Sequence, residues 1–302
     1  MDHDQNFKNL ILDYPEQAVT FFAAEEATAI DASARITPLR QEQLQERLGE
    51  RFRELDVPLL VEWPDGRREA LLFVIEEESR ARRFDIHRLA HYCLDLAALC
   101  ETDRVVPVVI FLDDGEVPAS LTLGGDHRDY LQFRYLACHL SCLPYRAYRD
   151  SDNLVARLNL PNMAWRTTGE KLEAFAAAVR GLQTLEPDPE RRLKYADFID
   201  IYGRLDHDEW ALYAQHYPQE TETMMGFAER FRTEGRDQGR DQGRDEGMQQ
   251  GEAAVLLRQI ESKFGSQAVS RCRQRIEKAD ADTLLIWSER ILTAESVDEV
   301  IH

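Results

Sequence analysis

The sequence has few cysteines and no motif that would organise them. Among 302 residues there are five, an odd number, and no two are spaced as Cys-x-x-Cys. Structural zinc sites and disulfide scaffolds both rely on regularly paired cysteines, so neither is expected. We interpret the five as reduced thiols of the core because most lie among apolar residues: Cys93, Cys100, Cys138, Cys142 and Cys272.

Long apolar runs and an excess of positive charge are also missing. No stretch approaches the roughly 18 apolar residues of a membrane span, and the N-terminus lacks a basic segment followed by an apolar one. We therefore expect a soluble, intracellular, cytoplasmic protein with no membrane partner. The chain has 37 basic and 56 acidic residues, a formal net charge of −19. That sign disfavours nucleic-acid binding unless positive charge is concentrated locally.

Apolar residues are plentiful enough for a folded core. The chain is 43% hydrophobic and 9% aromatic, which is typical of a folded protein. Residues 70–75 and 105–112 are almost wholly apolar and predict buried strands, while residues 86–100 have apolar positions at helical spacing. A strand, a helix and a second strand in succession predict a right-handed crossover. With one more strand expected over 131–140, we predict a small mixed α/β sheet.

A β-hairpin is expected at the start of this sheet. Residues 57–63 and 70–75 are apolar with β-branched members, and the Pro64-Asp65-Gly66 segment between them is a strong turn signal. A strongly charged segment precedes the hairpin, and the spacing of its apolar residues predicts an amphipathic helix over 38–55.

Carboxylates lie in the sequence directly before the first strand of the predicted hairpin and directly after its second strand. Asp56 precedes its first strand, and Glu76-Glu77-Glu78 follows its second strand. Side chains alternate across a strand, so Glu76 and Glu78 share one face. Oxygen ligands that converge in this way suit a hard divalent cation, so a Mg2+ or Mn2+ site is the sharper hypothesis. A solvated strand end is the alternative, since acidic side chains usually stay in water.

The most basic local segment adjoins these carboxylates. It carries four arginines, followed by Tyr92 one helical turn beyond the last of them: Arg80, Arg82, Arg83 and Arg88. Positive groups beside a metal–carboxylate cluster can hold a phosphate and offset the charge of a phosphodiester transition state. The alternative is a cationic helix start that packs against acidic neighbours.

Together these residues resemble the PD-(D/E)XK nuclease superfamily, and more narrowly the Rpn family of recombination-promoting nucleases and transposases. The resemblance rests on Asp56, the hairpin, Glu76-x-Glu78 and a helix that carries Arg88 and Tyr92. Supporting segments are residues 4–8, residues 106–109, residues 152–156 and a late series of glycine repeats. The resemblance covers about residues 1–230. It implies a restriction-endonuclease-like mixed sheet flanked by helices, and Mg2+-dependent DNA cleavage with Asp56 and Glu76 as the metal ligands.

One position departs from the family pattern. Glu78 stands where the superfamily usually has Lys and this group often has Gln. An ionised Glu only accepts hydrogen bonds, although it can serve as another metal ligand or, with a raised pKa, as a general base. Two further hypotheses therefore stay open. One is a nuclease fold kept as an oligomeric binding or regulatory module; the other is a metal-dependent phosphohydrolase acting on something other than DNA.

The sequence predicts four consecutive regions. They are an α/β nuclease-like domain over 1–165, a helical extension over 166–232, a charged repeat over 233–252 and a small helical domain over 253–302. The repeat has glycine at every fourth position, at Gly235, Gly239, Gly243, Gly247 and Gly251. A flexible charged linker and a helix that lets a partner helix approach closely are both compatible with it. The last region resembles a small C-terminal domain of unknown function, and self-association through these helices is expected.

Overall fold

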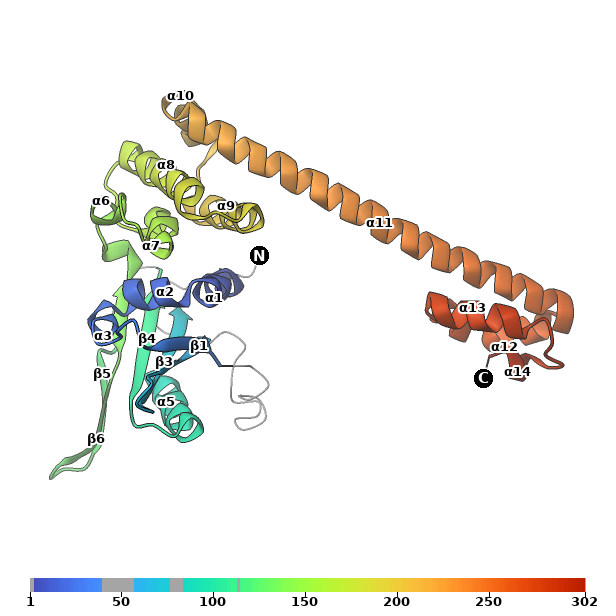
Figure 1. The fold of residues 1–302 in the computed structure, drawn as a ribbon, viewed down its shortest axis with the longest axis horizontal. Helices are drawn as coiled ribbons and strands as arrows, with labels where there is room; N and C mark the ends of the chain where they lie inside the picture. Colours follow the sequence, from blue (N-terminus) through green and yellow to red (C-terminus); the bar gives the residue numbers. More distant parts are fainter. Residues whose placement is uncertain (1–2, 40–56, 77–83, 113–114, 302) are drawn as a thin grey trace. The chain divides into compact units, whose positions relative to one another are not determined.

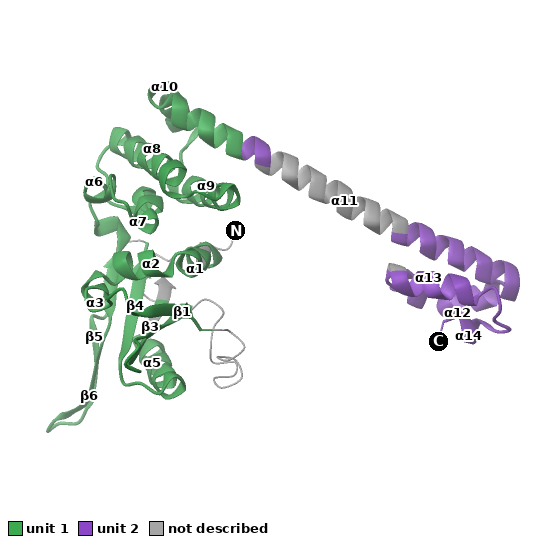
Figure 2. Ribbon diagram, viewed as in Figure 1, with its two compact units in different colours: residues 1–227 green, residues 228–302 purple. Residues whose placement is uncertain are grey.

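The computed structural model describes residues 3–39, 57–76, 84–112 and 115–301. These residues form two compact units, residues 1–227 and residues 228–302, which Figure 2 distinguishes by colour. Each unit has its own hydrophobic core. An amphipathic helix was expected over 38–55, and the structure describes its first two residues. Pro38 ends a strand and Leu39 follows it, so neither is helical; the rest of the predicted helix lies outside the described residues.

A mixed five-stranded sheet forms the centre of the first unit (Figure 1). Its strands, in spatial order, are β1 (Arg35–Pro38), β2 (Val57–Glu62), β3 (Arg68–Glu76), β4 (Val105–Phe111) and β7 (Leu136–His139). Pairing is antiparallel from β1 to β3 and parallel from β3 through β4 to β7. The prediction of a mixed α/β sheet is thus confirmed. The short β1 strand has little apolar character, and the sequence patterns did not reveal it.

The predicted hairpin is present as β2 and β3. The amide of Trp63 donates to the carbonyl of Arg67 across the turn at 3.0 Å. Gly66 has φ +86°, a left-handed conformation that glycine adopts without steric cost. The Asp65 side chain accepts a hydrogen bond from the Arg67 amide at 2.9 Å, as turn aspartates commonly do. Local turn chemistry therefore explains where the chain reverses.

Helices cover both faces of the sheet. On one face, Leu59, Leu71 and Phe73 are fully buried in a core shared with α1 (His3–Asp13) and α2 (Pro15–Phe22). The short α3 (Ala24–Ala27) follows. On the other face, α5 (Ile86–Cys100) packs Leu89, Tyr92 and Leu96 against Val109 and Phe111 of β4. Because both faces are covered, β4 needs an apolar residue at every position, which is the pattern found in its sequence.

Residues 131–140, predicted as one strand, form parts of two. The first part is β6 (Asp129–Arg134), which pairs with β5 (Ser120–Gly124) in a separate two-stranded antiparallel sheet. The second part is β7, which joins the main sheet. Tyr135 lies between them, and its hydroxyl donates to the carbonyl of Pro118 at 2.8 Å. The single-strand prediction was wrong because the pairing partners, rather than the apolar run, decide where a strand ends.

A helical layer completes the first unit. It contains α6 (Tyr145–Tyr148), α7 (Leu154–Leu158), α8 (Thr168–Leu185), α9 (Pro189–Gly203) and α10 (His207–His216), with single 3-10 turns at Leu140–Cys142 and Leu160–Asn162. Phe175 of α8 lies edge-on to Tyr213 of α10, with ring centroids 5.0 Å apart. A Cβ at Gly203 would come within 2.3 Å of the Phe175 ring, so the close approach of α9 to α8 requires glycine there.

The glycine repeat lies within a continuous helix. This helix, α11 (Pro218–Phe264), spans 47 residues, so the repeat is helical and not an irregular linker. It is followed by α12 (Ser266–Glu277), α13 (Ala281–Arg290) and α14 (Val297–Val300). Leu256, Ile260 and Cys272 are fully buried in the core of the second unit. Among the described residues, no helix has both the length and the apolar character needed to cross a membrane.

The cysteines differ in their surroundings. Cys93, Cys100 and Cys272 are buried, as expected for core residues. Cys138 is partly buried, and burial raises the pKa of its thiol to about 12. Cys142 is exposed, which corrects the expectation that all five belong to the core. It lies in the 3-10 turn after β7, where the chain has already left the sheet.

Candidate functional site

The structure describes only part of the predicted site. Asp56, Glu78, Arg80, Arg82 and Arg83 lie outside the described residues. For the remaining three, Glu76 ends β3, while Arg88 and Tyr92 belong to the first half of α5. The structure therefore shows the elements that adjoin the predicted site, which are β2, β3 and α5.

Several strand ends meet at one edge of the five-stranded sheet. Glu76 of β3 and His139 of β7 both pair with Phe111, the last residue of β4. β2 begins at the same edge, since its first residue, Val57, pairs with Phe73. We call this region the strand-end edge. The residue that precedes Val57 in the sequence is Asp56. Carboxyl ends of parallel strands are a common place for binding sites in α/β sheets.

The beginning of α5 lies at the strand-end edge as well. The Phe84 ring packs against Phe111, at 5.6 Å between centroids, and against Tyr135, at 5.1 Å. The Asp85 side chain then caps α5 by accepting hydrogen bonds from the amides of His87 and Arg88, so the helix starts there. The crossover predicted from the sequence is present, and it returns the chain to the edge where β3 ended.

Aromatic side chains line this edge. The imidazole of His139 stacks on Phe111, with ring centroids 4.6 Å apart and an interplanar angle of 13°. Phe84 and Tyr135 complete the cluster on β4. Burial raises the pKa of the Tyr135 hydroxyl, so this group stays protonated at neutral pH. The sequence predictions did not include this cluster, because its members come from three separate segments.

The two described members of the basic segment differ in exposure. Tyr92 is only 6% exposed and packs with Leu89, Cys93 and Val109 between α5 and the sheet. This packing fits local support, one of its two predicted roles; the other role, phosphate contact, stays a prediction. Arg88 is partly exposed one turn earlier in the same helix. Of the four arginines of this segment, Arg88 is the one that lies within the described residues.

The metal site remains a prediction. Within the described residues, no three His, Cys, Asp or Glu side chains lie close enough to hold a metal ion. This observation leaves the hypothesis open, because Asp56 and Glu78 are not described and Glu76 is described only as part of the β3 backbone. The structure places the end of β3, which carries Glu76, beside the start of β2 at Val57, the residue after Asp56.

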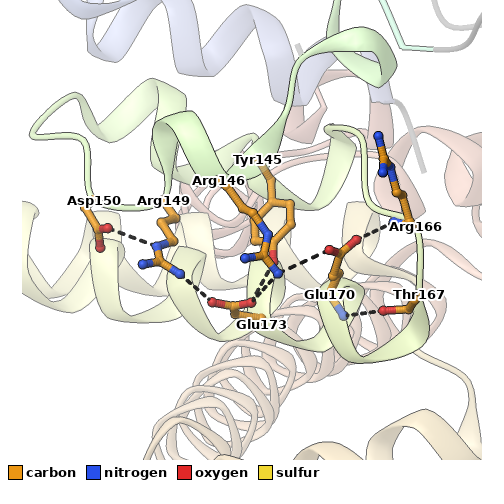
Figure 3. A network of polar contacts seen from close by, with 8 residues as sticks. All are labelled: Tyr145, Arg146, Arg149, Asp150, Arg166, Thr167, Glu170 and Glu173. Carbon is orange, nitrogen blue, oxygen red and sulfur yellow. Dashed lines mark hydrogen bonds and ion pairs between the residues drawn. The ribbon is translucent and has the colours of Figure 1, made fainter.

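A second polar cluster joins α6 to α8 (Figure 3). Glu173 of α8 accepts hydrogen bonds from the Tyr145 hydroxyl at 2.6 Å and from Arg149 Nη1 at 2.8 Å. Arg146 donates to Glu170 at 3.2 Å, and the Glu170 carboxylate also accepts from the Arg166 amide at 2.7 Å. Arg149 also donates to Asp150 at 3.0 Å, so the charged side chains of the network are two guanidinium groups and three carboxylates.

The electrostatics of this network indicate a structural role. The hydrogen bond from Tyr145, followed by the hydrogen bond from Arg149 and the charges of Arg146 and Arg149, lowers the pKa of Glu173 against the effect of burial. Burial, and then the hydrogen bond to Glu173, raises the pKa of Tyr145 to about 12. Glu173 is therefore ionised at neutral pH and already accepts from two donors, and its lowered pKa makes it a weak base. The network fastens α6 to α8.

Another polar cluster connects α1 to α9. The Tyr195 hydroxyl and the Lys194 ammonium both donate to Asp13 at 2.6 Å. Burial opposes ionisation of Asp13, but the hydrogen bonds from Lys194 and Tyr195 outweigh it and lower its pKa. Next to this pair, Tyr14 donates to the buried Glu186. Each carboxylate is matched by a donor, so this cluster too is best explained as a helix-to-helix contact.

A buried carboxylate lies at the opposite edge of the sheet. Glu69, near the start of β3, is 2% exposed and accepts from Arg104 Nε at 2.9 Å and from Arg104 Nη2. Across the β2–β3 turn, the guanidinium of Arg67 lies 4.1 Å from the centroid of the Trp63 ring. Arg104 thereby ties the beginning of β4 to β3, far along the strands from the strand-end edge.

Comparison with known proteins adds no relative: no family model, no curated protein and no solved structure matches this chain.

Proposed function

We propose that this protein is a metal-dependent DNA endonuclease of the recombination-promoting nuclease and transposase type, built on a PD-(D/E)XK fold. One observation carries the proposal. The start of β2, the end of β3 and the first turn of α5 lie together at one edge of a mixed sheet. Asp56 adjoins the first of these, Glu76 belongs to the second and Arg88 to the third. Carboxylates and a cation around one point are the groups that phosphodiester hydrolysis requires.

The donor set fits a hard divalent cation. Asp56 and Glu76 would hold Mg2+ or Mn2+, because carboxylate oxygens from two adjacent strand ends are the ligands such ions prefer. The bound ion would supply a Lewis acid that activates water and neutralises charge on the phosphate. Glu78 would act as a further ligand or as the base that takes the proton of the attacking water.

The remaining residues would position the substrate. Arg80, Arg82, Arg83 and Arg88 would attract the phosphodiester to an otherwise acidic protein by local positive charge. Tyr92 would support the site from within α5, since it packs between this helix and β4. The aromatic cluster of Phe84, Phe111 and Tyr135 would keep the strand ends rigid, which favours a precisely held set of ligands.

Cleavage of supercoiled plasmid with Mg2+ or Mn2+ tests the proposal. We expect wild-type protein to nick or linearise the plasmid and Glu76→Ala to lose this activity. Glu62→Ala is the matched control: this residue also ends a strand, but at the opposite edge, where it pairs with Arg68 at 3.1 Å. Glu78→Gln shows whether the third carboxylate helps or hinders. An inactive wild type that also binds no Mn2+ in calorimetry would exclude the nuclease.

An oligomeric binding or regulatory module is the second candidate. The net charge of −19 and the carboxylate at position 78 favour it over catalysis on DNA. Self-association would use the second unit, where α13 exposes Leu285 at 60% and Leu292 lies just beyond it at 76%. Sedimentation of wild type and of a Leu285→Ser/Leu292→Ser variant tests this candidate. We expect the variant alone to sediment as a monomer.

A further inference from the structure

In the two-stranded sheet, burial alternates along β6, whereas Leu121 is the one partly buried residue of β5. Leu121, Leu131 and Phe133 are partly buried, whereas the residues between them are exposed. Figure 1 shows this pair of strands extending as an arm away from the five-stranded sheet. A two-stranded ribbon is marginally stable by itself, so the half that packs on the protein must hold it in place.

The arm is anchored at the strand-end edge. Phe133 and Tyr135 pack against the cluster of α5 and β4, and the Tyr135 ring lies 5.1 Å from Phe84 and 6.5 Å from Phe111 between centroids. The base of the arm therefore adjoins the strand-end edge, where β3 ends at Glu76. Anything bound at the base of the arm would lie close to that edge.

The exposed face of the arm consists of hydrogen-bonding side chains. Cross-strand pairing sets Ser120 beside Arg134 and Thr122 beside Gln132, and paired residues in a sheet share a face. Four side chains make up this surface, which we call the ribbon face: Ser120, Thr122, Gln132 and Arg134. All four are exposed, and none of them is acidic, in a chain with 56 acidic residues.

Charge is distributed unevenly along the arm. Its two carboxylates, Asp126 and Asp129, lie in or next to the turn at its tip, where His127 and Arg128 also lie. Asp129 accepts a weak hydrogen bond from the Gln132 amide at 3.3 Å. Toward the base of the arm, Arg134 is the charged residue of the ribbon face. The half of the arm nearest the strand-end edge is therefore the half best suited to an anionic partner.

Duplex DNA fits the shape and chemistry of this face. The major groove is about 12 Å wide and admits a two-stranded β-ribbon whose strands are about 5 Å apart. Arg recognises guanine, Gln recognises adenine, and Ser or Thr recognises either type of base edge. Each of these residue types is present on the ribbon face.

We propose that the ribbon face enters the major groove and reads base edges, so that the arm gives the enzyme its sequence preference. This inference rests on the proposed function, because it takes DNA as the substrate. It adds to that function an element outside the carboxylate site, which selects where on the duplex the strand-end edge acts. Tyr130, 76% exposed near the tip, lies at the end of the same face.

Binding of full-length Glu76→Ala protein to DNA measures sequence recognition without cleavage, because this variant is expected to be inactive. A 30-base-pair duplex pool with a randomised centre is enriched by repeated selection, and the selected duplex is compared with a scrambled one by fluorescence anisotropy. We expect the selected duplex to bind about tenfold more tightly or better. Gln132→Ala and Arg134→Ala, each added to Glu76→Ala, should each reduce that ratio about tenfold at one base position and leave binding to the scrambled duplex unchanged.

Gln274→Ala and Arg273→Ala in α12 are the matched controls, because they remove the same two exposed residue types from the other unit. Their selected-to-scrambled ratios should equal that of the Glu76→Ala parent. Circular dichroism of the ribbon variants should match the parent, since the substituted side chains are exposed. Cleavage-site sequencing on plasmid by proteins with Glu76 intact should show the same loss of preference in Gln132→Ala and Arg134→Ala.

The possible results distinguish this inference from the function on which it rests. If wild type cuts DNA and the ribbon variants keep its preference, the arm does not read bases and only this inference fails. If the variants bind all duplexes more weakly with a shallower salt dependence, the arm contacts phosphates instead, which also overturns it. If the parent binds no duplex, both proposals fail. Changed sedimentation without changed DNA binding would identify the arm as a protein-contact surface.

Discussion

The two sheets of the first unit differ in how much of their surface is buried. Strands β3 and β4 are covered on both faces, and their residues Leu71, Phe73, Val108 and Ile110 are fully buried. Strands β5 and β6 are covered on one side only, and Leu123, in the middle of the arm, is 47% exposed. The first sheet is held by apolar burial, which is the dominant favourable term in folding. The second is held at its base and exposes hydrogen-bonding groups along its length.

This difference separates stability from recognition within one unit. Substitution of a buried side chain in the five-stranded sheet lowers the stability of the fold, and it alters function only as a consequence. A side chain on the ribbon face can change with little effect on the fold, because it contacts little of the protein. Substitutions in matched positions of the two sheets should therefore give effects of very different size.

The largest contrast is expected from buried apolar residues. Phe73→Ala removes a fully buried ring from β3 and should lower the free energy of unfolding by about 3–5 kcal/mol. Leu123→Ala in β5 should lower it by less than about 1 kcal/mol, since the side chain is half exposed. Denaturant titration in a Trp287→Phe background restricts tryptophan fluorescence to the first unit, which contains the other three tryptophans. Equal losses from the two substitutions would contradict the contrast.

A smaller contrast is expected between two arginines. Arg104→Ala leaves the buried carboxylate of Glu69 without its donor and should cost about 2 kcal/mol, because hydrogen bonds to charged groups contribute about 1.5–3 kcal/mol. Arg134→Ala on the ribbon face should cost less than about 0.5 kcal/mol. The same denaturant titration measures both. Adding Glu69→Gln to Arg104→Ala should recover part of the loss, since the buried charge is then removed.

The network between α6 and α8 adds a dependence of stability on pH. Glu173→Gln should cost about 1–2 kcal/mol at pH 7, because the side chain is 27% exposed and accepts from Tyr145 and Arg149. The pKa of Glu173 is lowered in the folded state, so its contribution is present above the unfolded pKa and is lost as pH falls through the folded pKa. Wild type and variant should converge in stability in acid. A difference that persists unchanged at pH 3 would exclude an ionised Glu173 as its source.

The smallest contrast compares two glycines in hairpin turns. Gly66 has φ +86° with open space around it, so Gly66→Ala should cost about 1 kcal/mol from backbone strain alone. Gly125, at the tip of the arm, also has open space and lacks a positive φ of this kind, so Gly125→Ala should be nearly neutral. Thermal unfolding of the two variants measures the difference. Equal melting temperatures would show that the β2–β3 turn can relax to a conformation that alanine tolerates.

The comparison also explains which strands could be predicted. β2, β3 and β4 are apolar at nearly every position because both of their faces are buried, and such runs are recognisable without knowing the partners. β5 has only Leu121 and Leu123 as apolar members, so its pattern does not stand out from a polar loop. β6 and β7 were merged because Tyr135 continues the apolar run between them while the backbone changes sheets.

The candidate site shows the same division. The order of hairpin, helix and strand could be predicted from the sequence, and this order brings the end of β3 and the start of α5 to one edge. The burial of Tyr92 could not, because helical spacing gives the faces of α5 but not the depth of the groove between α5 and β4. The pairing of Tyr145 and Arg149 with Glu173 could not be predicted either, because these two residues precede Glu173 by 28 and 24 positions in the sequence.

The sequence by itself determined the mixed α/β class, the β2–β3 hairpin with its Gly66 turn, and the crossover through α5 to β4. These features depend on local turn chemistry and on apolar periodicity, which are properties of neighbouring residues. Only the tertiary structure decided that β6 leaves the main sheet, that Glu69 is buried beside Arg104 and that the ribbon face lies open at the strand-end edge. The reason is physical: strand pairing and burial depend on groups distant in the sequence, and their positions follow from packing of the whole unit.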